Sequence, residues 1–210
     1  RFVNGGKTVY EQPMLFNADS IKPPSRIFRG KGYYKNDTLL VNSPFEFTYK
    51  NFYSLTDQQA FLQNLLFPEQ AESNRKFNLT EDDYRFIYQY MSQLPTETEW
   101  PPYSKDTTYF DAYCKFFMFG QEKSPIPKNI RIFNKVGDAY GYLIDNAYIV
   151  DFDNKVEFML SAVINVNTDG IYNDGVYDYD SLGFPFFRNL GNLIYAYELE
   201  RDRKYAPNLS

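Results

Sequence analysis

The residues with the clearest chemical potential in this sequence are Lys135-Val136-Gly137, in the middle of the apolar stretch 132–150. A lysine on a strand can place positive charge beside a bound ligand, and a glycine lets a ligand approach the backbone closely. The triplet alone also recurs by chance and fits an ordinary strand edge equally well. The elements around it must therefore decide between the two interpretations.

The composition limits the chemistry available to these residues. The 210-residue chain contains no histidine, which removes the commonest general base, the Ser-His-Asp triad and most transition-metal sites. Its single cysteine, Cys114, excludes an internal disulfide and a cysteine-rich zinc site. We therefore expect no metal and no cofactor, and any catalysis would have to use lysine, tyrosine, serine or carboxylate groups.

Charge and hydropathy argue against two classes of partner. The formal net charge is −5, and no run of adjacent basic residues is longer than a pair, which argues against nucleic acid. No run of about 20 apolar residues is present, so we expect no membrane-spanning helix. The 20 Tyr and 20 Phe either stack on flat ligands or build the core and its rim. The second use requires no ligand and is the favoured interpretation.

One loop matches part of a calcium-binding pattern. Asn165, Asn167, Asp169 and Gly170 have the required spacing, but Val176 occupies the twelfth position, where a bidentate glutamate is needed. A strand rather than a helix is predicted before this loop. We favour a solvated loop over a calcium site.

Composition and periodicity divide the chain into three segments. Residues 1–53 are rich in Gly, Pro, Asn and aromatic residues and read as a strand- and loop-rich extension without helices. Residues 54–127 form a helical segment, and residues 128–210 contain three antiparallel strands followed by a C-terminal helix. The predicted fold class is α+β, with an antiparallel sheet flanked by helices.

The helical segment contains three predicted helices. The first begins at Ser54 or Thr56 and stops before Pro68. The second begins at Thr80, with Asp83 placed three residues on as a capping residue. The third begins at Thr107 or Thr108, continues to residue 119 and would end at Gly120, which suits a helix C-terminus.

After residue 128 the hydrophobic period changes from that of a helix to that of strands. Strands are predicted at 130–136, 139–150 and 156–167, the last of them buried on both faces. The stretch 185–205 predicts an amphipathic helix lying across the sheet. Its apolar stripe consists of Leu190, Leu193, Ile194 and Tyr197.

In this context Lys135-Val136-Gly137 resembles the Lys-Thr-Gly element of penicillin-recognising serine enzymes. The order of elements over 107–203 is similar to the C-terminal half of class A β-lactamases and their relatives, in which the motif strand leads into two more strands and a closing helix. Asp145-Asn146 lies about where that family has an Asn-Asp pair. An unrelated α+β domain with a chance Lys-Val-Gly triplet is the alternative.

The resemblance implies a role for each residue of this strand. Lys135 would stand beside the nucleophile and supply positive potential, and the backbone N–H of Asp138 would be an oxyanion donor. Val136, Gly137 and Ala139 would line the substrate, with Gly137 allowing its backbone to lie against the strand. Val136 departs from the family, because its side chain lacks the hydroxyl that the family's threonine offers to the substrate carboxylate.

The nucleophile is the larger departure from the family. Ser73-Asn74-Arg75-Lys76 is the only Ser-x-x-Lys, and it lies in a polar stretch between predicted helices, too close to Lys135 for an intervening helical domain. The sequence contains no Ser-Asp-Asn and no Glu-x-x-Leu-Asn element. We therefore interpret the chain as a C-terminal portion whose partner is the N-terminal half of the same fold.

Three functions follow as hypotheses. The first is part of a serine hydrolase that forms an acyl-enzyme on a peptide, amide or ester substrate. The second is a catalytically degenerate domain that binds cell-wall peptide or glycan, and the third is an interaction module without a site. The resemblance alone implies a periplasmic or cell-envelope location.

Overall fold

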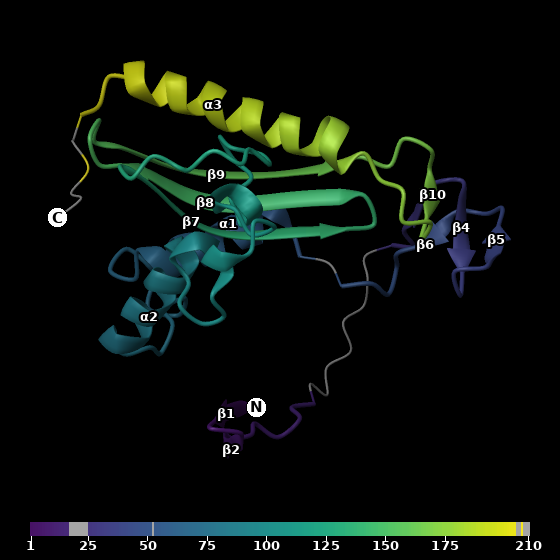
Figure 1. Ribbon diagram of the computed structural model, residues 1–210, viewed down its shortest axis with the longest axis horizontal. Helices are drawn as coiled ribbons and strands as arrows, with labels where there is room; N and C mark the ends of the chain where they lie inside the picture. Colours follow the sequence, from purple (N-terminus) through teal and green to yellow (C-terminus); the bar gives the residue numbers. More distant parts are fainter. Residues whose placement is uncertain (17–24, 52, 205–206, 208–210) are drawn as a thin grey trace.

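The computed structural model describes residues 1–16, 25–51, 53–204 and 207. It has a mixed α+β architecture, in which a three-stranded antiparallel sheet is packed between helices. Helix α3 (Phe184–Glu200) covers one face of the sheet, and α1 (Leu55–Leu66) and α2 (Glu81–Ser92) lie on the opposite side (Figure 1). The predicted α+β class with helices flanking an antiparallel sheet is confirmed at this level.

The sheet is formed by β7 (Ile130–Ala139), β8 (Tyr142–Asp151) and β9 (Val156–Asn165), in that spatial order. All three strands predicted after residue 128 are therefore present. The β7–β8 connection is a two-residue turn, Tyr140-Gly141, with φ angles of 55° and 74°. Positive φ at both positions is typical of the tight hairpin turns that match the twist of a sheet.

The prediction that the strand over 156–167 is buried on both faces is wrong. β9 is an edge strand, and its Val163 side chain is 47% exposed. The strand with the most buried residues is β8, which has a neighbour on each side. A continuous apolar run indicates a strand, but its neighbours decide how much of it is covered.

The core lies between the sheet and α3. Alternate residues of each strand point into it, as the period-2 geometry of strands requires. Aromatic residues from the loop before β7 and from α3 fill the space between the sheet and α3. Its members include Phe116, Phe117, Ile132, Leu143, Ala147, Ile149, Phe158, Phe184 and Phe187.

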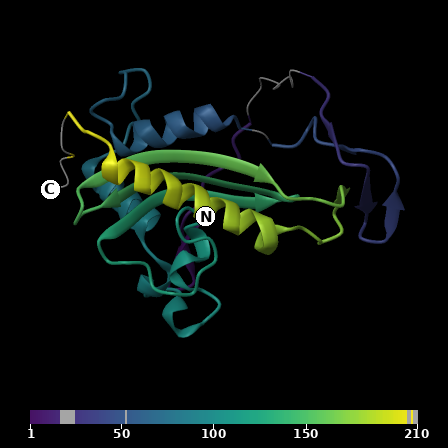
Figure 2. The same ribbon diagram turned by 90° about the horizontal axis from the view of Figure 1, so that it is seen from above.

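Helix α3 confirms the predicted C-terminal helix and runs along the length of the strands (Figure 2). Its predicted apolar stripe is only half right. Leu190 and Ile194 pack against the core, whereas Leu193 and Tyr197 are 67% and 61% exposed. The buried side is centred instead on Phe184, Phe187 and Gly191.

The first two predicted helices are confirmed as α1 and α2. Ser54 caps α1, because its hydroxyl accepts a hydrogen bond from the Asp57 N–H at 3.0 Å. Thr80 and Asp83 form a complete capping box at the start of α2, as the sequence predicted.

The third predicted helix, over 107–119, is wrong. Only one short 3₁₀ turn, η3 (Asp111–Cys114), forms there, and Met118 has a φ of 68°, which no α-helix allows. The side chains of Asp111 and Lys115 are buried, and both bond to groups far away in the sequence. Their tertiary hydrogen bonds outweigh the local helical tendency. Two further 3₁₀ turns precede this loop, η1 (Pro95–Glu97) and η2 (Tyr103–Lys105).

The N-terminal extension contains only short strands in its described residues 1–16 and 25–51. The strands are β1 (Phe2–Asn4), β2 (Lys7–Tyr10), β3 (Phe28–Arg29), β4 (Gly32–Lys35), β5 (Leu39–Val41) and β6 (Phe45–Glu46). β4 also pairs in parallel with β10 (Ile171–Tyr172), which precedes the π-helical turn η4 (Tyr179–Gly183). The extension is thereby joined to the segment after β9.

Aromatic rings reinforce this junction. The Phe45 ring lies 5.6 Å from the Tyr172 ring and 5.7 Å from the Tyr140 ring, and Phe47 lies 5.1 Å from Tyr172. These spacings are those of favourable ring pairs. Part of the high aromatic content therefore serves to attach the extension to the sheet.

Candidate functional site

The predicted site residues alternate between the two faces of β7. Val136 packs against the core on the α3 side. Lys135, Gly137 and Ala139 belong to the opposite face, toward α1 and α2, because neighbouring side chains of a strand point to opposite sides. Asp138 shares the face of Val136 and is exposed.

Lys135 is exposed, and its ammonium donates a hydrogen bond to the carbonyl of its own neighbour, Val136. Lys135 does not line the cavity described below. Gly137 fits closely over the next strand, since a Cβ at this position would stand 3.1 Å from Ile144 Cγ2. The glycine therefore has a packing reason as well as the predicted role of admitting a substrate.

A row of polar side chains crosses the sheet at the level of Lys135. Asn146 of β8 lies opposite Lys135 of β7, and Ser161 of β9 lies opposite Asn146. The Ser161 hydroxyl donates to Asn146 Oδ1, and Asn146 Nδ2 donates to the Gln58 carbonyl of α1 at 2.8 Å. The sequence pointed to Asn146 only through the family resemblance, and Ser161 was missed because no motif surrounds it.

A second lysine, Lys115, lies fully inside the protein, at 2% exposure. Its ammonium donates three hydrogen bonds: to the Met91 carbonyl at 2.7 Å, the Ile132 carbonyl at 2.8 Å and Asn134 Oδ1 at 2.7 Å. An ammonium has three donors, so this group is fully satisfied. Burial lowers the pKa of Lys115 to about 8.

The same network continues to Asp145 on β8. Asn134 Nδ2 donates to Asp145 Oδ1 at 3.0 Å, and the backbone N–H groups of Phe116 and Phe117 donate to Asp145 Oδ2 at 3.1 and 3.2 Å. Burial raises the pKa of Asp145 to about 7, against the opposing effect of these hydrogen bonds. The network ties the loop before β7 to both β7 and β8, and so positions the strand that carries Lys135.

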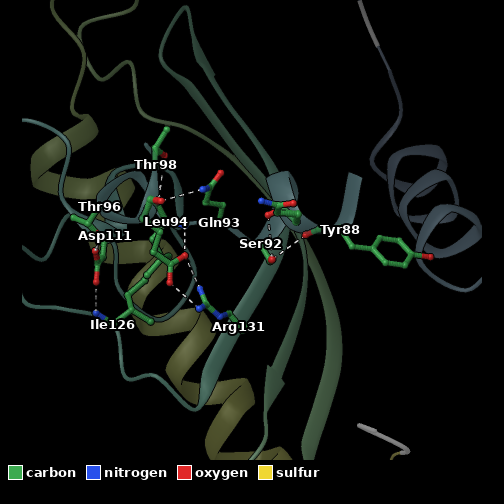
Figure 3. A network of polar contacts seen from close by, with 11 residues as sticks. Tyr88, Ser92, Gln93, Leu94, Thr96, Thr98, Asp111, Ile126 and Arg131 are labelled. Atoms are coloured by element: carbon green, nitrogen blue, oxygen red, sulfur yellow. Dashed lines mark hydrogen bonds and ion pairs between the residues drawn. The ribbon is translucent and has the colours of Figure 1, made fainter. Parts of the chain in front are cut away.

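Another polar network fixes the beginning of β7 (Figure 3). The Arg131 guanidinium donates two hydrogen bonds to Glu97, at 2.7 and 2.8 Å, and Glu97 also accepts the Leu94 N–H at 3.0 Å. The buried Asp111 carboxylate accepts the Ile126 N–H at 2.9 Å. The paired guanidinium lowers the pKa of Glu97.

A cavity of about 740 Å³ lies at the other end of the sheet, beside the β7–β8 turn. We name it the hairpin cavity. Its floor is formed by Tyr142, Ile144 and Val163 from the sheet, and Ala139 lies at its edge. Of the predicted site residues, only Ala139 therefore lines it.

The extension and α1 supply the other walls of the hairpin cavity. Phe47 and Tyr53 add aromatic rings, and Arg29 and Lys50 are the two cationic residues of its lining. Lys50 Nζ donates to the Tyr140 hydroxyl at 3.0 Å and stands 5.1 Å from the centroid of that ring. Sequence reasoning missed this site, although a lysine within the aromatic run 45–53 was its available signal.

The Ser-x-x-Lys tetrapeptide lies in an exposed turn between α1 and α2. Lys76 Nζ stands 3.8 Å from a carboxylate oxygen of Glu69. Ser73 is therefore not at a helix start, in agreement with the prediction of a loop.

Comparison with known proteins gives no match for this chain, whether with protein-family models, with curated proteins or with solved structures. The family resemblance stays a prediction. Within the described ranges, no helix has the length and apolar character needed to cross a membrane. In the same part of the chain, no group of three or more Cys, Asp or Glu side chains could hold a metal ion.

Proposed function

We propose that this chain is part of a β-lactamase-like serine hydrolase that acts through an acyl-enzyme on a peptide, amide or ester substrate. The nucleophile would come from outside these 210 residues. The observation that supports this proposal is the position of β7. Among the described strands, β7 pairs only with β8, so no described strand occupies its outer edge along the Lys135–Ala139 segment.

An open strand edge suits the proposed chemistry. An extended substrate can add to such an edge through main-chain hydrogen bonds. Lys135 is exposed and could supply positive charge to a nucleophile brought against this edge. The exposed Asp138 would provide its N–H as an oxyanion donor.

Exposed apolar surface supports the proposal that a further part of the same fold covers this one. Leu193 and Tyr197 lie one helical turn apart on α3 and are both largely exposed. On the sheet, β9 has an unpaired outer edge among the described strands. A covering element packed against α3 and β9 would bury both features. The periplasm or cell envelope is the location that accompanies this proposal.

The second candidate is a domain that binds cell-wall peptide or glycan without turnover. Val136 supports it, because this side chain packs against the core instead of offering a hydroxyl to a substrate carboxylate. Such a domain would keep the open edge of β7 as a binding surface and would need no nucleophile.

Acylation separates the two candidates. The natural polypeptide that carries these residues is incubated with a fluorescent penicillin, and the covalent adduct is measured by intact mass. We expect an adduct, and we expect Lys135→Ala to slow its formation by about 10²–10⁴-fold, the usual contribution of a positioned proton-transfer group. Lys128→Ala, an exposed lysine just before β7, is the matched control.

An unchanged acylation rate in Lys135→Ala would overturn the assignment of this lysine. Saturable penicillin binding without an adduct would favour the binding domain over the hydrolase. The absence of both penicillin binding and adduct formation would contradict both candidates.

A further inference from the structure

The geometry points to the hairpin cavity as a binding site for a small amphipathic carboxylate, a ligand with an aromatic or apolar body and one negative charge. The cavity lies at the end of the sheet and shares only Ala139 with the residues of the proposed hydrolase site. The inference therefore stands or falls independently of acyl-enzyme chemistry.

The size and the walls of the cavity define the body of the ligand. A volume of about 740 Å³ lies within the range of about 300–1,000 Å³ that is typical of small-molecule sites. Its floor is apolar at Ile144 and Val163, and the rings of Phe47 and Tyr142 stand beside it. A flat aromatic ligand could stack on these rings while covering the exposed Val163.

The charges around the cavity define the head group. Arg29 and Lys50 line it, and none of its lining residues is acidic. Asp138 and Asp145 adjoin lining residues in the sequence, but their side chains belong to the α3 side of the sheet, opposite the floor of the cavity. Asp57 accepts the Ser54 hydroxyl at the start of α1, and Glu46 is exposed on β6 opposite Phe28. None of these four acidic residues lines the cavity, so the lining favours an anion.

Lys50 is held in place before any ligand binds. Its ammonium lies 5.3 Å from the Phe45 ring and 5.1 Å from the Tyr140 ring, within the distance of cation–π attraction. The hydrogen bond to the Tyr140 hydroxyl uses one of its three donors. A carboxylate at the mouth of the cavity would meet an already oriented ammonium, which reduces the ordering cost of binding.

Dansylglycine is a suitable probe, because it joins a naphthalene body to a carboxylate and its fluorescence rises in apolar surroundings. Dansylamide has the same body without the charge. We expect saturable binding of dansylglycine to the 210-residue chain, with a Kd at least fivefold lower than that of dansylamide. Lys50→Met should remove this preference, whereas Lys35→Met, an exposed lysine on β4, should keep it.

A second variant tests the location of the probe. Val163→Trp fills the floor of the cavity and should weaken both probes at least fivefold. Val9→Trp is the matched control, since Val9 is an exposed strand valine of β2 that lines none of the described cavities. Circular dichroism and the thermal midpoint establish that each variant is folded. If Val163→Trp does not fold, Ala139→Trp blocks the cavity from its exposed edge.

Dansylglycine binding that the blocking variant leaves unchanged would overturn the site. Equal affinities for the two probes, or an unchanged preference in Lys50→Met, would overturn the anionic class of the ligand. None of these outcomes depends on acylation by penicillin, so failure here is distinguishable from failure of the proposed hydrolase.

Discussion

Lys115, in the loop before β7, and Lys135, on β7 itself, carry the same charge in opposite surroundings. Lys115 is 2% exposed and donates to three acceptors, one on α2 and two on β7. Lys135 is exposed and bonds to the carbonyl of the next residue. The lysine of the predicted motif is exposed, whereas the lysine outside any motif is committed to buried hydrogen bonds that join α2 and β7.

The surroundings of each lysine decide whether its charge stabilises the fold or stays accessible at the surface. The buried network supports β7 from the core side, whereas Lys135 is exposed and no described strand pairs with the outer edge of β7. A lysine that is fully satisfied by carbonyl and amide oxygens is a poor candidate for reaction, because any movement would leave buried acceptors unpaired.

The largest effect is expected from removing Lys115. Lys115→Met keeps the length of the side chain but leaves two buried acceptors and one partly buried acceptor without their donor, and it should lower the free energy of unfolding by about 3–5 kcal/mol. Lys135→Met is the comparison and should change it by less than about 0.5 kcal/mol, because the site is on the surface. Urea unfolding followed by circular dichroism measures both, and equal midpoints would show that the two lysines do not differ as described.

The next effect concerns Asp145, the acidic end of the buried network. Its folded pKa is raised from 3.8 to about 7, so between these pH values the folded state binds more protons than the unfolded state. Stability from this group therefore falls as the pH rises from about 4 to about 7. Asp145→Asn should cost about 1–3 kcal/mol and flatten this dependence.

Urea midpoints at pH 5 and pH 7 for the wild type and Asp145→Asn test the sign of this dependence. Asp138→Asn is the matched control, since Asp138 is an exposed carboxylate on the neighbouring strand. A wild-type stability that rises over this interval, while the Asp145→Asn variant stays flat, would contradict the direction of the pKa shift.

A smaller effect on stability is expected at Val136, which follows Lys135 on β7 but packs against the core. Val136→Thr replaces a methyl group that packs against the core with a hydroxyl, and should cost about 1 kcal/mol or somewhat more. Thermal unfolding measures it. If Val136 instead faces a substrate, the variant would leave stability unchanged and strengthen the binding of a carboxylate-bearing acyl compound to the natural polypeptide.

The smallest effect concerns Ser73, and the expected change is zero. The 210-residue chain by itself should not hydrolyse nitrocefin or p-nitrophenyl esters above background, because oxyanion and binding contributions without a nucleophile leave only residual catalysis. Ser73→Ala should therefore behave like the wild type. Turnover that disappears in Ser73→Ala would show that the exposed Ser-x-x-Lys is functional, and would remove the reason for placing the nucleophile elsewhere.

Much of the fold was determined by sequence patterns that act over short distances. The capping residues Ser54 and Thr80 specify where α1 and α2 begin, and alternation after residue 128 specifies three strands. These features depend on neighbours within a few residues, so they can be read without the rest of the molecule. Lys135 and Val136 lie in the strand predicted over 130–136, and β7 continues through Gly137 to Ala139.

Only the tertiary structure decided what those elements cover and which charges they bury. The stretch 107–119 has helical spacing, yet Asp111 bonds to the backbone of Ile126 and Lys115 bonds to β7. These long-range hydrogen bonds are satisfied in a loop instead of a helix. The hairpin cavity joins residues near Lys50 to residues near Ala139 and Val163, which no sequence spacing connects. Burial and long-range hydrogen bonds are properties of the whole packed chain, and their free energies exceed the local preferences that a sequence displays.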